Sequence, residues 1–306
     1  MRYAFLFPGQ GAQAVGMGKD FYDSFATAKE TFQEADDLLK EKLSTLMFEG
    51  PMESLTETRN SQLALFVHSM ALLRTLQKQL PSLIPAVCAG LSLGEYTALC
   101  ASGRLPFRET LFLIRERARL MNEACEKRPG TMAAVLGLSA DEIVSGVQGL
   151  SGVWVANFNA PGQTVISGTK EGIEKASLVL KEKGAKRVLP LSVHGAFHSG
   201  LMQSAQEGLA PFLDRALLQE SETGFVMNVP GDFVTGVDAV RQNLKAQVTH
   251  SVKWEQSIEA MKRAGVECYL EIGCGKTLTG LNKKIGVPSA VSIEKIHDLE
   301  VVHAAT

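Results

Sequence analysis

A serine flanked by glycines stands between a predicted strand and a predicted helix, and this arrangement constrains the fold more than any other part of the chain. The apolar run 86–89 predicts a buried strand, and 96–101 predicts a helix. Between them lies Gly90-Leu91-Ser92-Leu93-Gly94. A turn this sharp brings backbone atoms close together, so the residues two positions before and two positions after the serine must lack a Cβ. The pattern predicts a nucleophile elbow that exposes Ser92 Oγ and aims the N–H of Leu93 at a developing oxyanion.

Short apolar runs alternate with helical patterns along the rest of the chain, which is typical of the α/β class. Residues 3–7 predict another buried strand. Apolar spacing predicts long helices over 61–79 and 107–124, and one amphipathic helix over 24–46.

The region from 126 to 192 differs from its surroundings, because its elements are compact and follow the order βαββαβ. The predicted strands are 131–136, 153–157, 163–167 and 186–191, and the predicted helices are 140–148 and 170–183. This order is the ferredoxin-like pattern. We expect an inserted small subdomain at 126–192, a large domain formed by 1–125 and 193–306, and hinges at 129–130 and 192–195.

A serine nucleophile needs a base that takes its proton, and the chain has six histidines. Three are set aside because they lie in an apolar helix or near a polar C-terminus: His68, His297 and His303. Three remain candidates: His194, His198 and His250. The residues alone do not choose among these three.

Composition excludes several classes of protein. The formal net charge is −2 and no basic stripe is visible, which argues against nucleic-acid binding. No apolar run is long enough to span a bilayer, and the first residues lack the pattern of a signal peptide. The five cysteines are odd in number and contain no Cys-x-x-Cys pair, so neither a disulfide framework nor a zinc site is expected, and a cytoplasmic location fits.

Two glycine motifs suggest nucleotide binding and are rejected. Residues 9–14 fit the dinucleotide fingerprint, but the second strand that it requires is replaced by the helical pattern at 24–46. Gly275-Lys276-Thr277 lacks the earlier glycine of a P-loop, where Leu270 stands.

Several segments together with the elbow resemble the malonyl-CoA:acyl-carrier-protein transacylase family, which is related to the acyltransferase domains of fatty-acid and polyketide synthases. The matching segments run in the family's order from residue 5 to about 281 and comprise 7–13, 90–96, Arg117, 157–163, 195–199, Gln247 and 271–281. The resemblance implies an α/β-hydrolase-like large domain with an inserted ferredoxin-like subdomain, in agreement with the pattern at 126–192.

The resemblance also implies a role for each matched residue. The implied site consists of Ser92 as the acylated nucleophile, His198 as its base, Gln247 as the residue whose main-chain carbonyl holds that histidine, Gln10 and Leu93 as backbone donors of the oxyanion hole, and Arg117 as the partner of the malonyl carboxylate. The planar guanidinium of arginine binds a carboxylate through two parallel hydrogen bonds. Arg115 and Arg119 lie about 200° around the helix from Arg117, so we expect them to point elsewhere.

The implied activity is transfer of a malonyl group from malonyl-CoA to the phosphopantetheine thiol of acyl carrier protein in fatty-acid synthesis. Malonyl-CoA and acyl carrier protein are the expected partners, without a metal or other cofactor, and a monomer is expected. The alternatives are transfer of a different acyl group, a thioesterase-like serine hydrolase, and a catalytically impaired module that binds carrier protein. Carrier proteins are acidic in general, so an exposed basic cluster is a candidate docking surface: Lys181, Lys183, Lys186 and Arg187.

The chain departs from the family's pattern at three positions. Leu91 replaces a histidine beside the nucleophile, which removes a polar neighbour but leaves the backbone donors, so we expect activity with an altered rate or pH dependence. Cys274 replaces a proline, with little expected effect. His194 stands where a small residue is common and is a minor competitor of His198 as the base.

Overall fold

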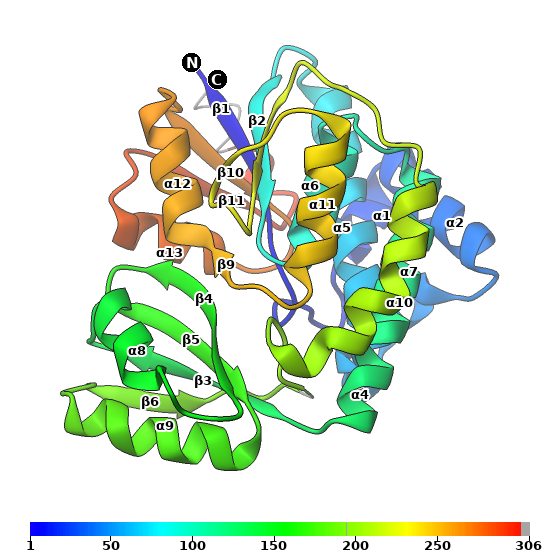
Figure 1. Ribbon diagram of the computed structural model, residues 1–306. Helices are drawn as coiled ribbons and strands as arrows, with labels where there is room; N and C mark the ends of the chain where they lie inside the picture. Colours follow the sequence, from blue (N-terminus) through cyan, green and yellow to red (C-terminus); the bar gives the residue numbers. More distant parts are fainter. Residues whose placement is uncertain (194, 301–306) are drawn as a thin grey trace.

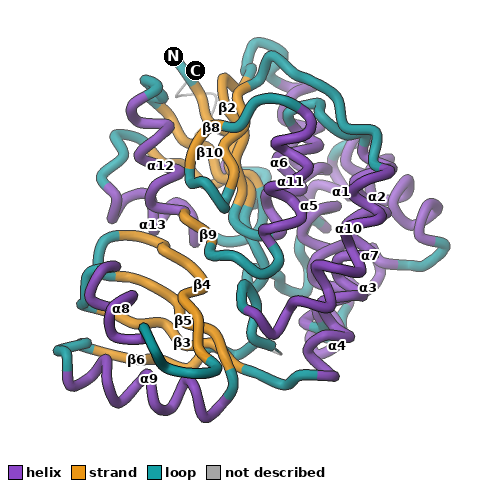
Figure 2. Tube along the Cα trace, in the orientation of Figure 1, coloured by secondary structure: helices purple, strands orange, loops and turns teal. Residues whose placement is uncertain are grey.

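A computed structural model of the protein describes residues 1–193 and 195–300 (Figure 1). It has two β-sheets with helices packed around them, and the smaller sheet lies below the larger one in the view of Figure 2. The predicted α/β class is confirmed, with an α/β-hydrolase-like large part and a ferredoxin-like small part. His194 and His303 lie outside the described residues.

The large sheet is mostly parallel and has the strand order β11-β10-β1-β2-β7-β8. Its strands are β1 (Tyr3–Phe7), β2 (Pro85–Gly90), β7 (Gly224–Met227), β8 (Asp232–Phe233), β10 (Cys268–Ile272) and β11 (Ala290–Ile293). β1 runs parallel to both of its neighbours, β2 and β10, while β8 pairs antiparallel with β7. Strands buried on both faces read as continuous apolar runs, which is why β1 and β2 could be predicted from the sequence.

Helices cover both faces of this sheet. They are α1 (Lys19–Ser24), α2 (Ala26–Leu39), α3 (Leu43–Glu49), α4 (Met52–Thr56), α5 (Thr58–Gln79), α6 (Leu93–Ala101), α7 (Phe107–Lys127), α10 (Gln203–Arg215), α11 (Val237–Gln247), α12 (Trp254–Arg263) and α13 (Thr277–Ile285), with a short 3₁₀ turn η1 (Gly200–Met202) before α10.

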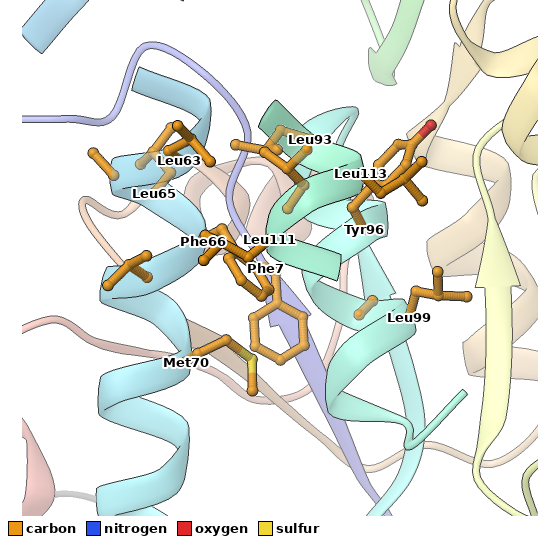
Figure 3. Close-up of a cluster of buried hydrophobic side chains, with 14 of the residues drawn as sticks. Phe7, Leu63, Leu65, Phe66, Met70, Leu93, Tyr96, Leu99, Leu111 and Leu113 are labelled. Carbon is orange, nitrogen blue, oxygen red and sulfur yellow. The ribbon is translucent and has the colours of Figure 1, made fainter. Parts of the chain in front are cut away.

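Alternate residues of β1 enter two different cores, as the two-residue repeat of a strand requires. Phe5 and Phe7 pack in the cluster that holds the apolar faces of α5 and α7. Ala4 and Leu6 pack in the cluster of α12 and α13. Figure 3 shows Phe7 close to Phe66 of α5, with α6 on the other side. The central strand is therefore fixed from both faces, and the loop that leaves it is held in place.

The small sheet has the order β6-β3-β5-β4-β9. Its elements are β3 (Thr131–Leu136), α8 (Ala140–Val147), β4 (Val153–Ala160), β5 (Gln163–Gly168), α9 (Lys170–Glu182), β6 (Arg187–Pro190) and β9 (Val252–Lys253). The first four strands in this order are antiparallel neighbours, as in a ferredoxin-like sheet. The βαββαβ prediction is confirmed: half of the twelve element ends lie where they were predicted, and the other half differ by one to three residues.

The predicted single helix over 24–46 is wrong, because the chain breaks twice there. Phe25 is extended between α1 and α2, and Lys40 takes a left-handed conformation after α2. The turn before α3 is held by the buried Asp36, whose carboxylate accepts from the N–H and the hydroxyl of Ser44 at 3.0 and 2.6 Å. Apolar periodicity continues through both breaks, so it did not reveal them.

We propose the division into 1–125 with 193–306 and 126–192 as a description of two packed units. The first boundary falls near the end of α7, which runs to Lys127. One strand crosses the division, because β9 pairs in parallel with β4 through Asn157–Val252 and Phe158–Lys253.

Candidate active site

Ser92 lies at a sharp turn between β2 and α6, with φ 55° and ψ −105°. A Cβ on Gly94 would lie 2.0 Å from the carbonyl oxygen of Phe7, and a Cβ on Gly90 would lie 2.0 Å from the backbone of Gly94. Both glycines are therefore required by close approach of the backbone, as expected for a nucleophile elbow.

His198 is the histidine that the structure brings to Ser92. The Ser92 hydroxyl donates to His198 Nε2 at 2.8 Å, and His198 Nδ1–H donates to the carbonyl oxygen of Gln247 at 2.8 Å. A carbonyl can only accept, so it fixes the tautomer in which Nε2 carries the free lone pair. His250 is exposed and its Nδ1 donates to the carbonyl oxygen of Ala246, so its imidazole does not reach Ser92.

The environment keeps His198 neutral. Burial, and after it the charge of Arg117, lower the pKa of His198 to about 4, while backbone hydrogen bonds with Gln247 and His250 act in the opposite direction. Among the described residues no carboxylate contacts this imidazole. The pair is therefore a serine and a neutral histidine, held by a main-chain carbonyl where a Ser-His-Asp triad has a carboxylate.

Arg117 lies behind Ser92 with its side chain almost completely buried. One terminal nitrogen donates to Ser92 Oγ at 3.2 Å and to Gln247 Oε1 at 3.0 Å, and the other donates to Gln62 Oε1 at 2.5 Å. The guanidinium also lies 5.1 Å from the ring of Tyr96. These partners are all uncharged, so the arginine can exchange some of them for an anion.

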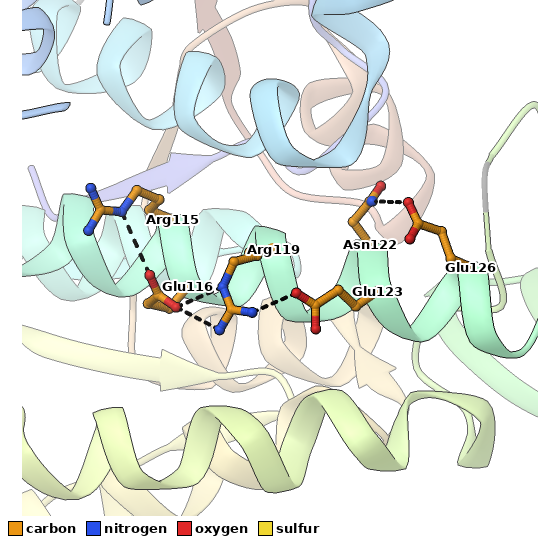
Figure 4. Close-up of polar contacts among 6 residues, drawn as sticks. All are labelled: Arg115, Glu116, Arg119, Asn122, Glu123 and Glu126. Atoms are coloured by element: carbon orange, nitrogen blue, oxygen red, sulfur yellow. Dashed lines mark hydrogen bonds and ion pairs between the residues drawn. The ribbon is translucent and has the colours of Figure 1, made fainter. Parts of the chain in front are cut away.

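The neighbouring arginines point away from the site, as predicted. Arg115 and Arg119 are about half exposed and pair with Glu116 on the outer face of α7 (Figure 4). Arg119 also pairs with Glu123 at 2.6 Å. Arg117 is thus buried, whereas the arginines two residues before and after it are exposed to solvent.

A cavity of about 650 Å³ opens beside the serine and the histidine. Its lining includes Gln10 and Leu91 from the large part and Asn157 and Gln163 from the small sheet, so it lies between the two units. Leu93 is the first residue of α6, and its N–H has no carbonyl four residues earlier in that helix. The loop of Gln10 and the start of α6 both border the nucleophile.

Three buried polar residues at this site were missed from the sequence: Gln62, Glu95 and Asn228. Gln62 interrupts an apolar helix, and an amide in such a position was the available signal. Asn228 Oδ1 accepts from the N–H of Ser92 at 2.8 Å, and its Nδ2 donates to Gly90 O at 2.7 Å. Asn228 directly follows β7 and braces the elbow from there, at a distance in sequence that no local pattern reveals.

Other chemistry-bearing groups lie away from the nucleophile. Cys274 is buried, and burial raises its pKa to about 12, so its thiol is unreactive. The cysteines are all free thiols. Within 1–193 and 195–300, no group of three or more His, Cys, Asp or Glu side chains could hold a metal ion. No helix in those same ranges is both long and apolar enough to cross a bilayer.

Comparison with protein families and curated proteins gives consistent matches. Residues 4–280 match the family described as the acyl transferase domain. The chain is 43% identical over 288 residues to the malonyl CoA-acyl carrier protein transacylase of Bacillus subtilis (strain 168), covering 93% of this chain and 90% of that protein. It is 41% identical over 287 residues to the Escherichia coli (strain K12) protein of the same name, covering 93% of each.

Solved structures agree with these matches. A malonyl-transacylase in complex with a type II PKS acyl-carrier protein superposes with a TM-score of 0.96 at 35% identity, covering 100% of both chains. The MCAT structure from Streptococcus pneumoniae gives a TM-score of 0.94 at 36% identity, also covering 100% of both chains.

Proposed function

Because this chain belongs to the acyl transferase family, and within it to the malonyl CoA-acyl carrier protein transacylases, we propose that Ser92 and His198 carry its reaction. The enzyme transfers a malonyl group from malonyl-CoA to acyl carrier protein for fatty-acid synthesis. The observation that carries the assignment of the residues is the 2.8 Å hydrogen bond from the strained serine to the neutral histidine.

In the first half-reaction, Ser92 Oγ attacks the thioester carbonyl while His198 Nε2 takes the hydroxyl proton. The tetrahedral oxyanion is stabilised by the backbone N–H groups of Gln10 and Leu93. The C–S bond breaks, the imidazolium returns its proton to the sulfur, and coenzyme A leaves. The malonyl group remains as an ester on Ser92.

In the second half-reaction, the phosphopantetheine thiol of acyl carrier protein attacks the ester. His198 takes the thiol proton and gives it to Ser92 Oγ as the C–O bond breaks. A lone pair on Nε2 is needed at the start of each half-reaction, and the hydrogen bond from Nδ1–H to Gln247 supports that tautomer in both.

Arg117 selects the malonyl group by its carboxylate. Its terminal nitrogen already contacts Ser92 Oγ, which places a positive charge beside the acyl position. An acetyl group would leave that buried charge without an ionic partner, and such a mismatch discriminates strongly.

Intact-protein mass spectrometry after brief mixing with malonyl-CoA tests the proposal. The native chain is expected to gain the mass of one malonyl group, and Ser92→Ala to gain none. Added carrier protein should then remove the adduct and become malonylated. Loss of the adduct to water at the same rate without carrier protein would favour the hydrolase alternative. Absence of any adduct, with malonyl-CoA left intact, would favour the binding module and implicate Leu91.

The remaining expectations stand as proposals. The acyl carrier protein partner is supported by the structural relative that contains one. The chemistry above uses protein groups and the substrate's own thioester and calls for no cofactor. A cytoplasmic location is proposed from the free cysteines.

A further inference from the structure

Glu95 is a completely buried carboxyl group directly beneath the elbow, and the two half-reactions above do not use it. It lies in the first turn of α6 and points inward. One carboxyl oxygen accepts from the backbone N–H of Asn228 at 2.5 Å, and the other accepts from Gln247 Nε2 at 3.0 Å. Both oxygens therefore receive hydrogen bonds, which is the arrangement that suits an ionised carboxylate.

The amide of Gln247 connects this carboxyl group to Arg117. Its Nε2 donates to Glu95 and its Oε1 accepts from Arg117 at 3.0 Å, so the amide dipole is aligned between a negative and a positive group. Across the described residues, Arg117 has no carboxylate at ion-pair distance. A buried guanidinium needs a compensating charge; burial lowers the pKa of Arg117, the acids that raise it are Tyr96 and then Glu95, and of these two Glu95 is the carboxyl group.

The charges around Glu95 come from few groups. Arg117 on α7 is the cation that acts on it, and Tyr96 on its own helix and His198 beyond Gln247 are the other titratable side chains nearby. Its hydrogen-bond donors are the backbone of Asn228, directly after β7, and the side chain of Gln247 at the end of α11, both neutral residues. Burial raises the pKa of Glu95 to about 8, while the backbone hydrogen bond and Arg117 pull it down. Glu95 is therefore ionised in the unloaded enzyme above about pH 8, and this charge depends on whether Arg117 remains available to it.

We propose that Glu95 is the counter-charge of Arg117 in the unloaded enzyme and that it takes up one proton when a malonyl carboxylate occupies Arg117. This inference rests on the proposed role of Arg117. With malonyl bound, one buried cation would face two buried anions, and protonation of Glu95 restores neutrality. The proton comes from solvent, converts the carboxylate to a carboxylic acid, and returns to solvent when malonyl leaves on the carrier protein.

The proposal predicts a proton linkage that acetyl-CoA does not show. In the Ser92→Ala background, which prevents turnover, binding is measured calorimetrically in two buffers of different ionisation enthalpy at about pH 9, roughly one unit above the pKa of Glu95, so that Glu95 is largely ionised before loading. Malonyl-CoA is expected to take up as much as about one proton, and acetyl-CoA close to none. The affinity for malonyl-CoA should fall with rising pH by at most about tenfold per unit.

Two further variants in the same background identify the proton's site. Glu95→Gln should abolish the uptake, whereas His198→Ala should keep it. Uptake that persists in Glu95→Gln and disappears in His198→Ala would assign the proton to the histidine and overturn the proposal. Equal uptake with both acyl groups would overturn it as well.

A measurement without any change at Glu95 covers the case in which Glu95→Gln does not fold. Infrared difference spectra of Ser92→Ala should show a new carboxylic-acid carbonyl band on addition of malonyl-CoA and not of acetyl-CoA. Selective binding of malonyl-CoA without this band refutes the role of Glu95 alone. Equal binding of the two thioesters refutes the role of Arg117 instead.

Discussion

The two residues at the centre of the reaction both hold unusual backbone conformations. Ser92 has φ 55° and His198 has φ 56°, values that cost a non-glycine residue about 1–3 kcal/mol. Side chains distant in sequence offset this cost at Ser92: Asn228 accepts from its N–H, and Gln247 Nε2 donates to its carbonyl at 2.8 Å. The same Gln247 holds His198 through its main chain. One residue thus sets the position of both partners.

The low pKa of His198 predicts activity that persists in mild acid. The imidazole titrates near pH 4 in the free enzyme, so its Nε2 lone pair is available throughout the range above that value. The value of kcat/KM for malonyl-CoA should stay nearly constant from pH 7 down to about pH 5, where an ordinary histidine is mostly protonated. A loss of activity centred near pH 6.5 would contradict this environment for His198.

Arg117→Ala should reduce malonyl transfer by roughly a hundredfold or more, because a buried charged hydrogen-bond partner of the carboxylate is lost. Loading of acetyl should be spared or should increase. Arg115→Ala is the matched control, since it removes the same side chain from the exposed face of the same helix. Steady-state kinetics with both thioesters measure the ratio, and similar losses for Arg117→Ala and Arg115→Ala would rule out a carboxylate role.

Among single residues, the sequence alone identified the functional residues that belong to short local motifs. Ser92 was found because a turn between strand and helix requires glycines within two positions. Gln62 and Asn228 were not, because their partners lie 55 and 136 residues away in the chain. The choice of histidine depended on the family resemblance, since nothing local separates His198 from His250.

At the scale of elements, the packing of α6 against β1 decides whether the elbow forms. Gly94→Ala would place a methyl group on the carbonyl of Phe7 and should destabilise the protein by at least about 2 kcal/mol, with loss of acylation. Gly280→Ala, in the exposed part of α13, meets no atom within 4 Å. It should be neutral or stabilise by about 1 kcal/mol. Denaturant unfolding compares the two, and equal stability changes would be inconsistent with this packing.

The helix α5 carries a buried histidine that should make the fold sensitive to acid. Burial lowers the pKa of His68 to about 3, and neither ring nitrogen has a hydrogen-bond partner among the residues described. Below pH 6.5 the unfolded chain binds a proton at this residue that the folded state does not bind. Stability is therefore lost as the pH falls from about 6.5 toward 3.

His68→Leu tests this sign. As the pH falls, the free energy of unfolding should decrease less in the variant than in the native chain. The difference between the two should grow by about 1.4 kcal/mol for each pH unit below 6.5. Unfolding free energies at several pH values provide the measurement. Parallel curves for the two proteins would show that this histidine does not contribute.

Helices and strands could be predicted from the sequence where a single pattern of apolar residues was bounded at both ends by residues that end such elements. β1 and β3 have their predicted ends because glycine, proline or charged residues bound short apolar runs. The prediction over 24–46 failed because its breaks depend on the extended backbone of Phe25, on the left-handed conformation of Lys40 and on a hydrogen bond from Ser44 to Asp36. None of these changes the spacing of apolar residues.

For the molecule as a whole, a basic cluster is a candidate docking surface for the acidic carrier protein. It consists of Lys181, Lys183, Lys186 and Arg187, all exposed, near the end of α9 and the start of β6. The strand β6 leads from there to Leu191, which lines the cavity, over about 13 Å of extended chain.

Reversal of two charges, Lys181→Glu with Lys183→Glu, should raise the KM for carrier protein and leave the KM for malonyl-CoA unchanged. The matched control is Lys29→Glu with Lys78→Glu, which changes net charge equally on α2 and α5, away from α9 (Figure 1). The effect should weaken with added salt, because exposed charges are screened. Equal changes in both KM values, or equal effects of the control pair, would exclude docking at this cluster.

The short strand β9 has a consequence for recombination between relatives. It follows α11 closely in the chain yet completes the sheet of the small unit beside β4, and Ser251 Oγ donates to the carbonyl of Val155 at 2.6 Å. A chimera that imports 126–192 alone from another transacylase would keep the recipient's β9 against a foreign β4. The contact between this segment and β4 begins at Ser251, four residues after Gln247. A mismatch there would therefore disturb the carbonyl group of Gln247 that holds His198. The exchangeable unit is therefore discontinuous, and a crossover design for new acyl preferences should carry residues 251–253 along with the insert.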